Sequence, residues 1–368
     1  MSYGALSSNA IRALNKGAKI GGFSHNTGEG SLSPYHLEPG GDIVWQIGTG
    51  YFGCRTESGD FNPEKFRETA ALEVVKMIEV KLSQGAKPGH GGILPAAKLT
   101  EEIAEIRGVP MGSDVVSPPA HTAFSTPMEL LNFVDQLREL SGGKPVGIKL
   151  CIGRRDEFLA ICKAMVSTGQ HPDFVTVDGG EGGTGAAPTE MTNSVGTPLR
   201  DALIFVNQAL TGIGFRDKVR IIASGKILSA FHLLRAVALG ADTVNSARGM
   251  MMALGCIQAR SCNTDHCPTG IATQNPIRSK GLVVSDKAER VANFQRATVE
   301  NVVELLGAAG LESLDQLEPR HINHRVHGTD IKTYEQLYPC IEANTLLNES
   351  TMPEEWVDDW RAADPAKW

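Results

Sequence analysis

Short runs rich in β-branched and apolar residues alternate along the chain with longer stretches of helical spacing. The short runs end in glycine or polar residues and predict strands at 18–25, 43–48, 75–82, 146–151, 173–178, 218–224 and 242–246. Helices are predicted near 128–140, 154–168, 198–212 and 228–239, and the last of these keeps Leu228, Phe231, Leu234, Ala238 and Leu239 at helical spacing. This alternation predicts parallel strands joined by right-handed crossovers.

The seven predicted strands approach the eight of a (β/α)8 barrel. The eighth would have to be residues 1–4, which are barely long enough for a strand. A further helix is predicted near 285–310, and a polar, Trp-containing tail follows at 340–368. No Pro/Gly-rich linker divides the chain. The pattern therefore predicts an α/β fold, a TIM (β/α)8 barrel in one domain with a C-terminal extension.

Glycine and polar residues collect where the predicted strands end, at 26–30, 81–92, 178–185, 224–226 and 246–249. Parallel α/β folds place their active sites at these carboxyl ends. Glycine makes up 40 of the 368 residues, above the usual figure of about 7%, and it lets the backbone approach a ligand closely. The alternative, that glycine merely ends the strands, leaves the lysines and aspartate in these segments unexplained.

Charge and cysteine content exclude several classes of protein. The net charge is -7 and no Lys/Arg-rich run occurs, which argues against nucleic-acid binding. No apolar stretch reaches the roughly 18 residues of a membrane span, and the N-terminus lacks the basic region of a signal peptide. Seven cysteines are an odd number, which favours free thiols or a metal site over a disulfide framework. We predict a cytoplasmic protein without a membrane or nucleic-acid partner.

Two consecutive late strands end in turns that could bind a phosphate. The run 221–225 leads into Ser224 and Gly225, and the run 242–249 leads into Ala247, Arg248 and Gly249. In barrels that bind a phosphate-bearing ligand, the loops after strands seven and eight donate backbone N–H groups to the phosphate. Glycine permits the close approach and Arg248 can add charge. Two ordinary βα turns are the alternative interpretation.

Lysines stand near the ends of two other predicted strands. The segment 79–92 contains Lys81, Lys87 and His90, and Lys149 ends the apolar run 146–150. Lysines in these places can hold an anionic substrate or stabilise negative charge on a reduced cofactor ring. Solvated surface lysines are the alternative, which is weaker for Lys149 because its neighbours in the sequence are apolar.

Cys256, Cys262 and Cys267 lie within one short segment, and Pro268 follows the last of them. This spacing resembles iron–sulfur ligation. Three thiolates suit a three-iron cluster, or a four-iron cluster with one non-cysteine ligand. Zinc is a competitor with His266 as the fourth ligand, although the paired C-x2-C spacing of structural zinc sites is absent. Three unrelated buried cysteines remain a third possibility.

Six motifs taken together resemble a known family. They are MSYGALS (1–7), NTGEG (26–30), QGAKPG (84–89), SPP (117–119), GGTGA (182–186), and the stretch from ALGC (253–256) to CPTGIATQ (267–274). In this order they are similar to the flavin-binding synthase domain of glutamate synthases, and more closely to the stand-alone FMN-binding glutamate synthase family. The resemblance covers residues 1–325 and leaves 326–368 as a C-terminal extension.

This resemblance implies a TIM barrel of the FMN-dependent oxidoreductase type. It implies FMN and a [3Fe–4S] cluster as cofactors, and reduction of 2-iminoglutarate, made from 2-oxoglutarate and an amine, to glutamate. By position, the residues beside the flavin would be Ser2, Gln46, Lys149, Gly182, Gly183 and Thr184. The residues around its phosphate would be Ser224, Gly225, Ala247, Arg248 and Gly249. Lys81, Lys87 and Arg107 match the cations that hold the 2-oxo acid. Cys256, Cys262 and Cys267 match the cluster ligands.

The chain also departs from the synthase pattern. His90, Ile93 and Asn9 stand where the synthases have Glu, Gln and Glu, so a different 2-oxo acid or amine is an alternative. There is no glutaminase domain, so ammonia would come from solution or from separate amidotransferase-like subunits, and electrons from a ferredoxin or reductase subunit. The family has residues before the 1–7 motif, which predicts a barrel lacking part of strand 1. A non-catalytic electron-transfer or scaffold subunit is the remaining alternative.

Overall fold

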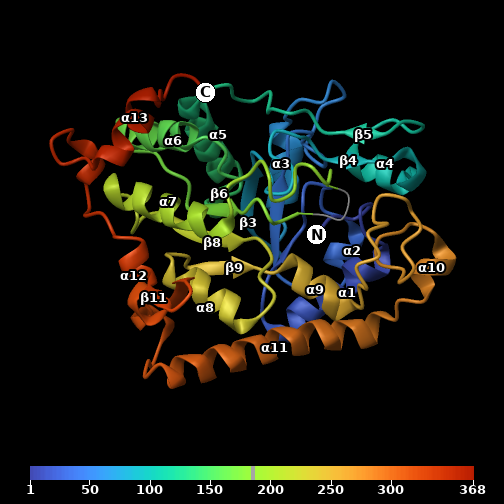
Figure 1. The fold of residues 1–368 in the computed structure, drawn as a ribbon. Coiled ribbons are helices and arrows are strands. Elements are labelled where there is room, and N and C mark those ends of the chain that lie inside the picture. Colours follow the sequence, from blue (N-terminus) through green and yellow to red (C-terminus); the bar gives the residue numbers. More distant parts are fainter. Residues whose placement is uncertain (184–186) are drawn as a thin grey trace.

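A computed structural model describes residues 1–183 and 187–368. A curled, parallel sheet in the order β1-β2-β3-β6-β7-β8-β9 forms its centre (Figure 1). Its strands are β1 (His25–Asn26), β2 (Ile43–Ile47), β3 (Val75–Lys81), β6 (Val146–Leu150), β7 (Phe174–Asp178), β8 (Arg220–Ser224) and β9 (Thr243–Asn245). Within the described residues β1 and β9 do not pair, so the sheet is a partial TIM barrel.

Helices cover the outer face of this sheet and carry the chain from each strand to the next (Figure 1). They include α3 (Pro63–Ala70), α5 (Pro127–Leu140), α6 (Arg155–Thr168), α7 (Leu199–Gly212) and α8 (Ala230–Ala238). The helix α9 (Ala247–Leu254) follows β9, the last strand of the sheet. The strands β2 and β7 are buried along their whole length, as expected for parallel strands covered on both faces. Trp45 of β2, fully buried, stacks on Phe66 of α3 at a ring distance of 5.3 Å.

The predicted strand at 18–25 is wrong for most of its length. Helix α1 (Ser8–Gly21) occupies this region, and Gly22 ends it in the left-handed conformation at φ 68°. Its buried face is formed by residues at helical spacing, among them Ile11, Leu14 and Ala18. A short apolar run such as 18–23 does not by itself distinguish a strand from a buried helix. Only His25–Asn26 is strand, and residues 1–4 contribute no more than an isolated bridge from Tyr3 to Leu6.

The other predicted strands and all five predicted helices are confirmed to within a few residues at each end. The helix predicted near 285–310 is α11 (Val284–Ala308), which packs along α1. Additional short elements are α2 (Pro34–Leu37), β4 (Ile93–Leu94), α4 (Glu101–Arg107), β5 (Val115–Val116) and α10 (Pro276–Lys280). These lie on the side of the barrel that bears the N-terminal segment (Figure 1).

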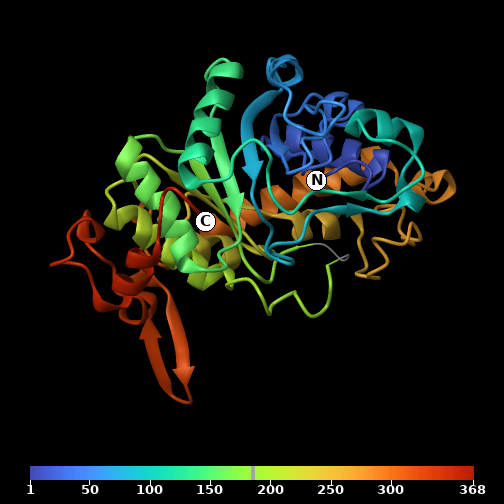
Figure 2. The ribbon, with the colours of Figure 1, turned by 90° about the horizontal axis from the view of Figure 1, so that it is seen from above.

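The C-terminal region begins with a hairpin of β10 (Asn323–His327) and β11 (Asp330–Thr333), which projects from the barrel (Figure 2). The predicted division between 325 and 326 falls inside β10 and stays a prediction. After α12 (Tyr334–Leu337), the last helix α13 (Glu354–Ala362) packs back on the barrel, where Trp356 stacks on Phe205 at 5.3 Å. Among the described helices, none is long and apolar enough to cross a membrane.

Candidate active site

The carboxylate of Glu79 is buried near the C-terminal end of β3. It accepts hydrogen bonds from the Asn26 amide at 2.9 Å, the Thr176 hydroxyl at 2.7 Å and the Gln46 amide. Because these partners come from β1, β7 and β2, the carboxylate holds three strands in one arrangement. It also orients the side chain of Gln46, which was predicted to lie beside the flavin. The sequence offered no signal for Glu79 beyond an acidic residue in an apolar strand.

Lys149 lies at the end of β6 next to a second buried carboxylate, Asp178 at the end of β7. The Lys149 Nζ is 3.7 Å from Asp178 Oδ2. Asp178 also accepts the Gly85 N–H at 2.8 Å and the Ser224 hydroxyl at 2.7 Å. Burial lowers the pKa of Lys149, but the carboxylates of Asp178 and Glu79 outweigh it and raise the pKa overall. Lys149 is therefore a charged side chain with a defined position, and Asp178 joins it to Ser224.

The two predicted phosphate turns lie together with the glycine loop that follows β7. A Cβ on Gly182 would lie 3.4 Å from the Gly225 Cα, and Arg248 donates to the Gly183 carbonyl at 3.3 Å. The Ser246 hydroxyl donates to the Ile227 carbonyl and does not cap α9. The first N–H groups of α9, at Ala247, Arg248 and Gly249, thus have no capping side chain and suit an anion. Thr184 lies outside the described residues.

Lys81, Lys87 and Arg107 are all buried and gather around the carboxylate of Glu29. The Lys81 Nζ is 3.1 Å from Glu29 Oε1. Burial lowers the pKa of Lys87, and that of Arg107 to about 10, while Glu29 opposes both shifts. Three cations against one carboxylate leave an excess of positive charge in a space largely closed to water. Such a site suits an anion with more than one negative group.

The backbone holds these cations in place. Lys87 donates to the Gly91 carbonyl at 3.0 Å, and Arg107 donates to the Tyr3 carbonyl at 3.1 Å. The Arg107 Nε is buried without a hydrogen-bond partner among the described residues. A small hollow beside Glu29 and Lys81 is lined also by His90. Ile93 follows two residues after Gly91, which lines the hollow; it belongs to β4, is half exposed and pairs with Val116 of β5.

Ser2 and the loop after β1 lie beside Arg107. A Cβ on Gly30 would lie 2.7 Å from the Ser2 Cβ and 2.9 Å from the Arg107 Nη2. Ser2 therefore lies near the cations that were predicted to hold the acid. The structure brings it to the same end of the barrel as Gln46 and Lys149.

His121 is a buried residue that the sequence did not single out. Its Nε2 lies 2.9 Å from the Lys81 carbonyl, which can only accept, so Nε2 carries the proton. The Nδ1 then accepts from the Tyr51 hydroxyl at 3.0 Å, and Tyr51 accepts the Ala123 N–H at 3.1 Å. Burial lowers the pKa of His121 to about 4, so the ring is neutral near pH 7. This chain of hydrogen bonds positions the end of β3.

We expect His121 to make the protein less stable in acid. The unfolded histidine takes up a proton below about pH 6.5, whereas the folded one does so only below about pH 4. The unfolded state therefore binds more protons between these values, and up to about 3 kcal/mol of unfolding free energy is lost as the pH falls from 6.5 to 4. Urea unfolding at several pH values should show a weaker pH dependence for His121→Gln. His327→Gln, in the exposed part of β10, is the control; equal slopes for His121→Gln and the natural protein would contradict the assignment.

Cys256, Cys262 and Cys267 lie on the loop between α9 and α10, partly buried. Burial raises the pKa of Cys267, but hydrogen bonds from the Thr269 hydroxyl and from the backbone N–H groups of Thr269, Ile271 and Ala272 outweigh it and lower the pKa overall. Burial and the two neighbouring thiols raise the pKa of Cys262, while Lys98 and Arg248 oppose them. Within residues 1–183 and 187–368, no three His, Cys, Asp or Glu side chains are arranged as a metal site. The loop nevertheless has three thiols, N–H donors and nearby cations, a donor set that suits an iron–sulfur cluster.

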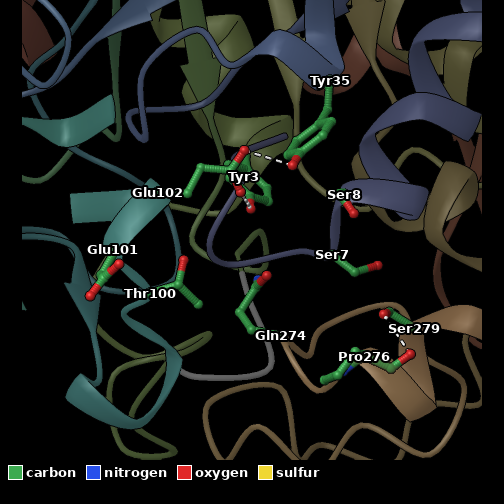
Figure 3. A pocket seen from close by; sticks show the side chains of 10 residues that line it. All are labelled: Tyr3, Ser7, Ser8, Tyr35, Thr100, Glu101, Glu102, Gln274, Pro276 and Ser279. Carbon is green, nitrogen blue, oxygen red and sulfur yellow. Dashed lines mark hydrogen bonds between the residues drawn. The ribbon is translucent and has the colours of Figure 1, made fainter. Parts of the chain in front are cut away.

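A larger cavity of about 430 Å³ lies between the N-terminal segment, the start of α4 and the segment around α10 (Figure 3). Its lining is Tyr3, Ser7, Ser8, Tyr35, Thr100, Glu101, Glu102, Gln274, Pro276 and Ser279. The hydroxyls of Tyr3 and Tyr35 both donate to the carboxylate of Glu102. Tyr3 thus borders this cavity with its ring, while its carbonyl binds Arg107. Among the residues that the structure describes, none that the sequence predicted for the active site lines this cavity.

The fold and the site together define a partial α/β barrel with a cluster of buried cations near the carboxyl ends of its strands. Residues 1–312 match the family described as "Conserved region in glutamate synthase", and the chain belongs to this family. It is 45% identical over 326 residues to the "Glutamate synthase large subunit-like protein YerD" of Bacillus subtilis, covering 88% of this chain and 62% of that protein. It is 39% identical to the "Archaeal glutamate synthase [NADPH]" of Methanocaldococcus jannaschii, covering 92% of this chain and 63% of that protein.

The chain therefore spans less than two thirds of the length of these relatives. Among solved structures, a point mutant of flavocytochrome b2 has a TM-score of 0.50 at 13% sequence identity, covering 84% of this chain and 63% of the other. This likeness shows the barrel fold, as predicted from the strand–helix alternation.

Proposed function

We propose that this chain is an FMN- and iron–sulfur-dependent oxidoreductase that reduces a 2-imino acid to an amino acid. The substrate would form from a 2-oxo acid and an amine, with 2-iminoglutarate and glutamate as the pair that the family implies. The observation that carries the proposal is the cluster of Lys81, Lys87 and Arg107 around Glu29, at the barrel end that also bears Lys149. Its relatives named glutamate synthases support the same reaction.

The residues at the carboxyl ends of the strands fit FMN. Its phosphate would lie at the Ser224–Gly225 turn and the start of α9, and its ring beside Gln46 and Lys149. A glycine at 183, where φ is +123° and a Cβ would lie 1.8 Å from the Ala86 Cβ, lets the loops close over this region. When bound, reduced FMN supplies the hydride for the imine carbon. Lys149 would stabilise negative charge on the reduced ring, and Asp178 would hold that lysine in place.

The cations would perform the substrate chemistry. Lys81, Lys87 and Arg107 neutralise the carboxylates of a 2-oxo acid and orient its 2-carbon, so that binding requires little further ordering. Glu29 forms an ion pair with Lys81 at 3.1 Å and can accept a hydrogen bond from an ammonium or iminium nitrogen. The burial of the cations excludes water, which strengthens these interactions. Hydrolysis of the imine is thereby also disfavoured.

Cys256, Cys262 and Cys267 would hold a [3Fe–4S] cluster, which supplies electrons one at a time when bound. The chain would receive electrons from a ferredoxin or reductase subunit and its amine from solution or an amidotransferase-like subunit. All seven cysteines lie in the described part of the chain and are free, which supports a cytoplasmic location. The half-exposed Ile93 beside the pocket favours a second candidate, the same reaction on a less polar 2-oxo acid.

Anaerobic purification followed by cofactor analysis and turnover tests the proposal. We expect bound FMN and iron, and glutamate formation when dithionite, ammonia and 2-oxoglutarate are supplied. Bound flavin without glutamate, but with turnover of a less polar 2-oxo acid, would favour the second candidate. If the protein binds neither flavin nor iron after reconstitution, both enzymatic candidates fail and a non-catalytic scaffold subunit is the remaining interpretation.

Gly225 should be required for tight flavin binding. Its φ of +147° is one that side chains rarely adopt, and its turn faces the start of α9. Gly225→Val places a branched side chain in the proposed phosphate site, and we expect FMN affinity to fall about tenfold or more, as followed by fluorescence titration of the flavin-free protein. Gly142→Ala is the matched control, because Gly142 also has a positive φ of +74° but lies in open space. Unchanged affinity in Gly225→Val would place the phosphate elsewhere.

A further inference from the structure

Lys98 is a buried lysine to which neither the predicted site nor the proposed reaction assigns a role. It is the last residue of the short 3-10 helix Ala96–Lys98 and is only 2% exposed. Within the described chain it makes no ion pair with a carboxylate. An ammonium group taken out of water in this way destabilises the fold unless other groups compensate its charge. A methionine of similar length would fill the same space without that penalty.

The ammonium group of Lys98 donates to three main-chain carbonyls. These belong to Ala5 at 2.6 Å, Cys262 at 3.0 Å and Ala272 at 3.2 Å. All three donors of the group are thereby used. The partners come from the N-terminal segment, from the cysteine loop (residues 256–267) and from the segment that follows it. One side chain therefore fixes three segments that are far apart in the sequence.

Lys98 also connects the cysteine loop to the cation pocket. Three residues after it, α4 begins at Glu101, and this helix ends at Arg107. Figures 1 and 2 show α4 beside the loop between α9 and α10. A shift of the cysteine loop would pull on Lys98, and hence on the start of the helix that carries Arg107.

Lys98 keeps a partly uncompensated charge, because its three partners are neutral carbonyl groups. One of these carbonyls belongs to Cys262. An anionic centre held by Cys256, Cys262 and Cys267 would supply negative charge near this ammonium group.

We propose that Lys98 is the positioning residue of the cysteine loop. It holds the main chain of Cys262 and Ala272 so that the three thiols can bind one anionic metal centre. It also links that centre to α4, the helix that ends at Arg107. This inference rests on the metal-binding part of the proposed function. It assigns no step of the reaction to Lys98. The role is to fix the loop before the metal arrives and to balance its charge afterwards.

The test compares Lys98→Met with Lys144→Met. Lys144 is a matched control, because its Nζ also donates to two main-chain carbonyls, those of Ala70 and Leu72, at the opposite end of the strands. Hydrogen exchange of the iron-free protein should speed up in residues 256–272 in Lys98→Met and not in Lys144→Met. In the iron-loaded protein, Lys98→Met should lose iron to a chelator about tenfold faster or more, as expected for outer-shell partners of metal ligands.

Iron content tests the proposed cluster, and hydrogen exchange tests whether Lys98 fixes the cysteine loop. If the natural protein binds no iron, the proposed cluster fails, and hydrogen exchange still decides whether Lys98 fixes the loop. If Lys98→Met folds and shows the same hydrogen exchange and the same rate of iron loss as the natural protein, the inference is overturned. Should Lys98→Met not fold, Lys98→Arg, which keeps the charge and several donors, is expected to fold and to retain iron better than Lys98→Gln; equal iron loss in those two variants would also overturn it.

Discussion

Replacing Cys262 with serine is expected to remove the iron from the protein, whereas replacing Cys340 is expected to leave it in place. A serine hydroxyl binds iron far more weakly than a thiolate, and a three-thiol donor set has no spare ligand. Cys340 lies exposed in the C-terminal region, which makes Cys340→Ser a control for the loss of a thiol as such. Iron per chain, determined by elemental analysis after anaerobic purification, measures the effect.

The same measurement distinguishes the alternatives for the cysteine loop. Zinc in place of iron in the natural protein, retained in Cys340→Ser and lost in Cys262→Ser, would identify a zinc site. Full iron content in Cys262→Ser would exclude Cys262 as a ligand. Cys256→Ser and Cys267→Ser should behave as Cys262→Ser does, since the proposal gives the three thiols the same role.

Replacing Arg107 with methionine should weaken binding of the 2-oxo acid strongly and leave flavin binding unchanged. Loss of one member of a buried, charge-assisted contact costs about 2–5 kcal/mol, which corresponds to a rise in KM of about thirtyfold or more. Arg107 donates from its Nη2 to the Tyr3 carbonyl, and its buried Nε has no hydrogen-bond partner in 1–183 and 187–368, so its guanidinium still has capacity for a carboxylate. Steady-state kinetics and titration of the flavin spectrum with 2-oxoglutarate measure the change.

Arg55 provides the control for this prediction. Both guanidinium groups lie over the ring of Phe52, at 5.1 Å for Arg107 and 5.7 Å for Arg55. Arg55→Met therefore tests whether loss of the ring contact alone affects the substrate. Arg107→Lys should recover part of the affinity, because it restores the charge without the fork of donors. A KM unchanged in Arg107→Met, with flavin bound, would remove Arg107 from the acid site.

Local sequence signals predicted most of the barrel. Strands such as β2 and β7 are continuous apolar runs, and the helices between them show their apolar spacing in the sequence. The exception at 18–25 has a physical reason: the short run 18–23 is compatible with a strand, and packing of α1 on α11 selected the helix. Contacts with a helix more than 250 residues further along the chain are not visible in an eleven-residue window.

The candidate site, like the fold, depends partly on local sequence and partly on long-range contacts. The sequence by itself determined which chemistry is available, because the lysines, the glycine turns and the three cysteines stand at the ends of recognisable strands or in one short loop. Only the tertiary structure decided which of these groups lie close to one another. Glu79, Asp178, His121 and Lys98 are single polar residues whose partners lie on other strands or loops, and burial makes each of those partnerships obligatory. Their roles follow from desolvation, a property of the folded chain that no local pattern contains.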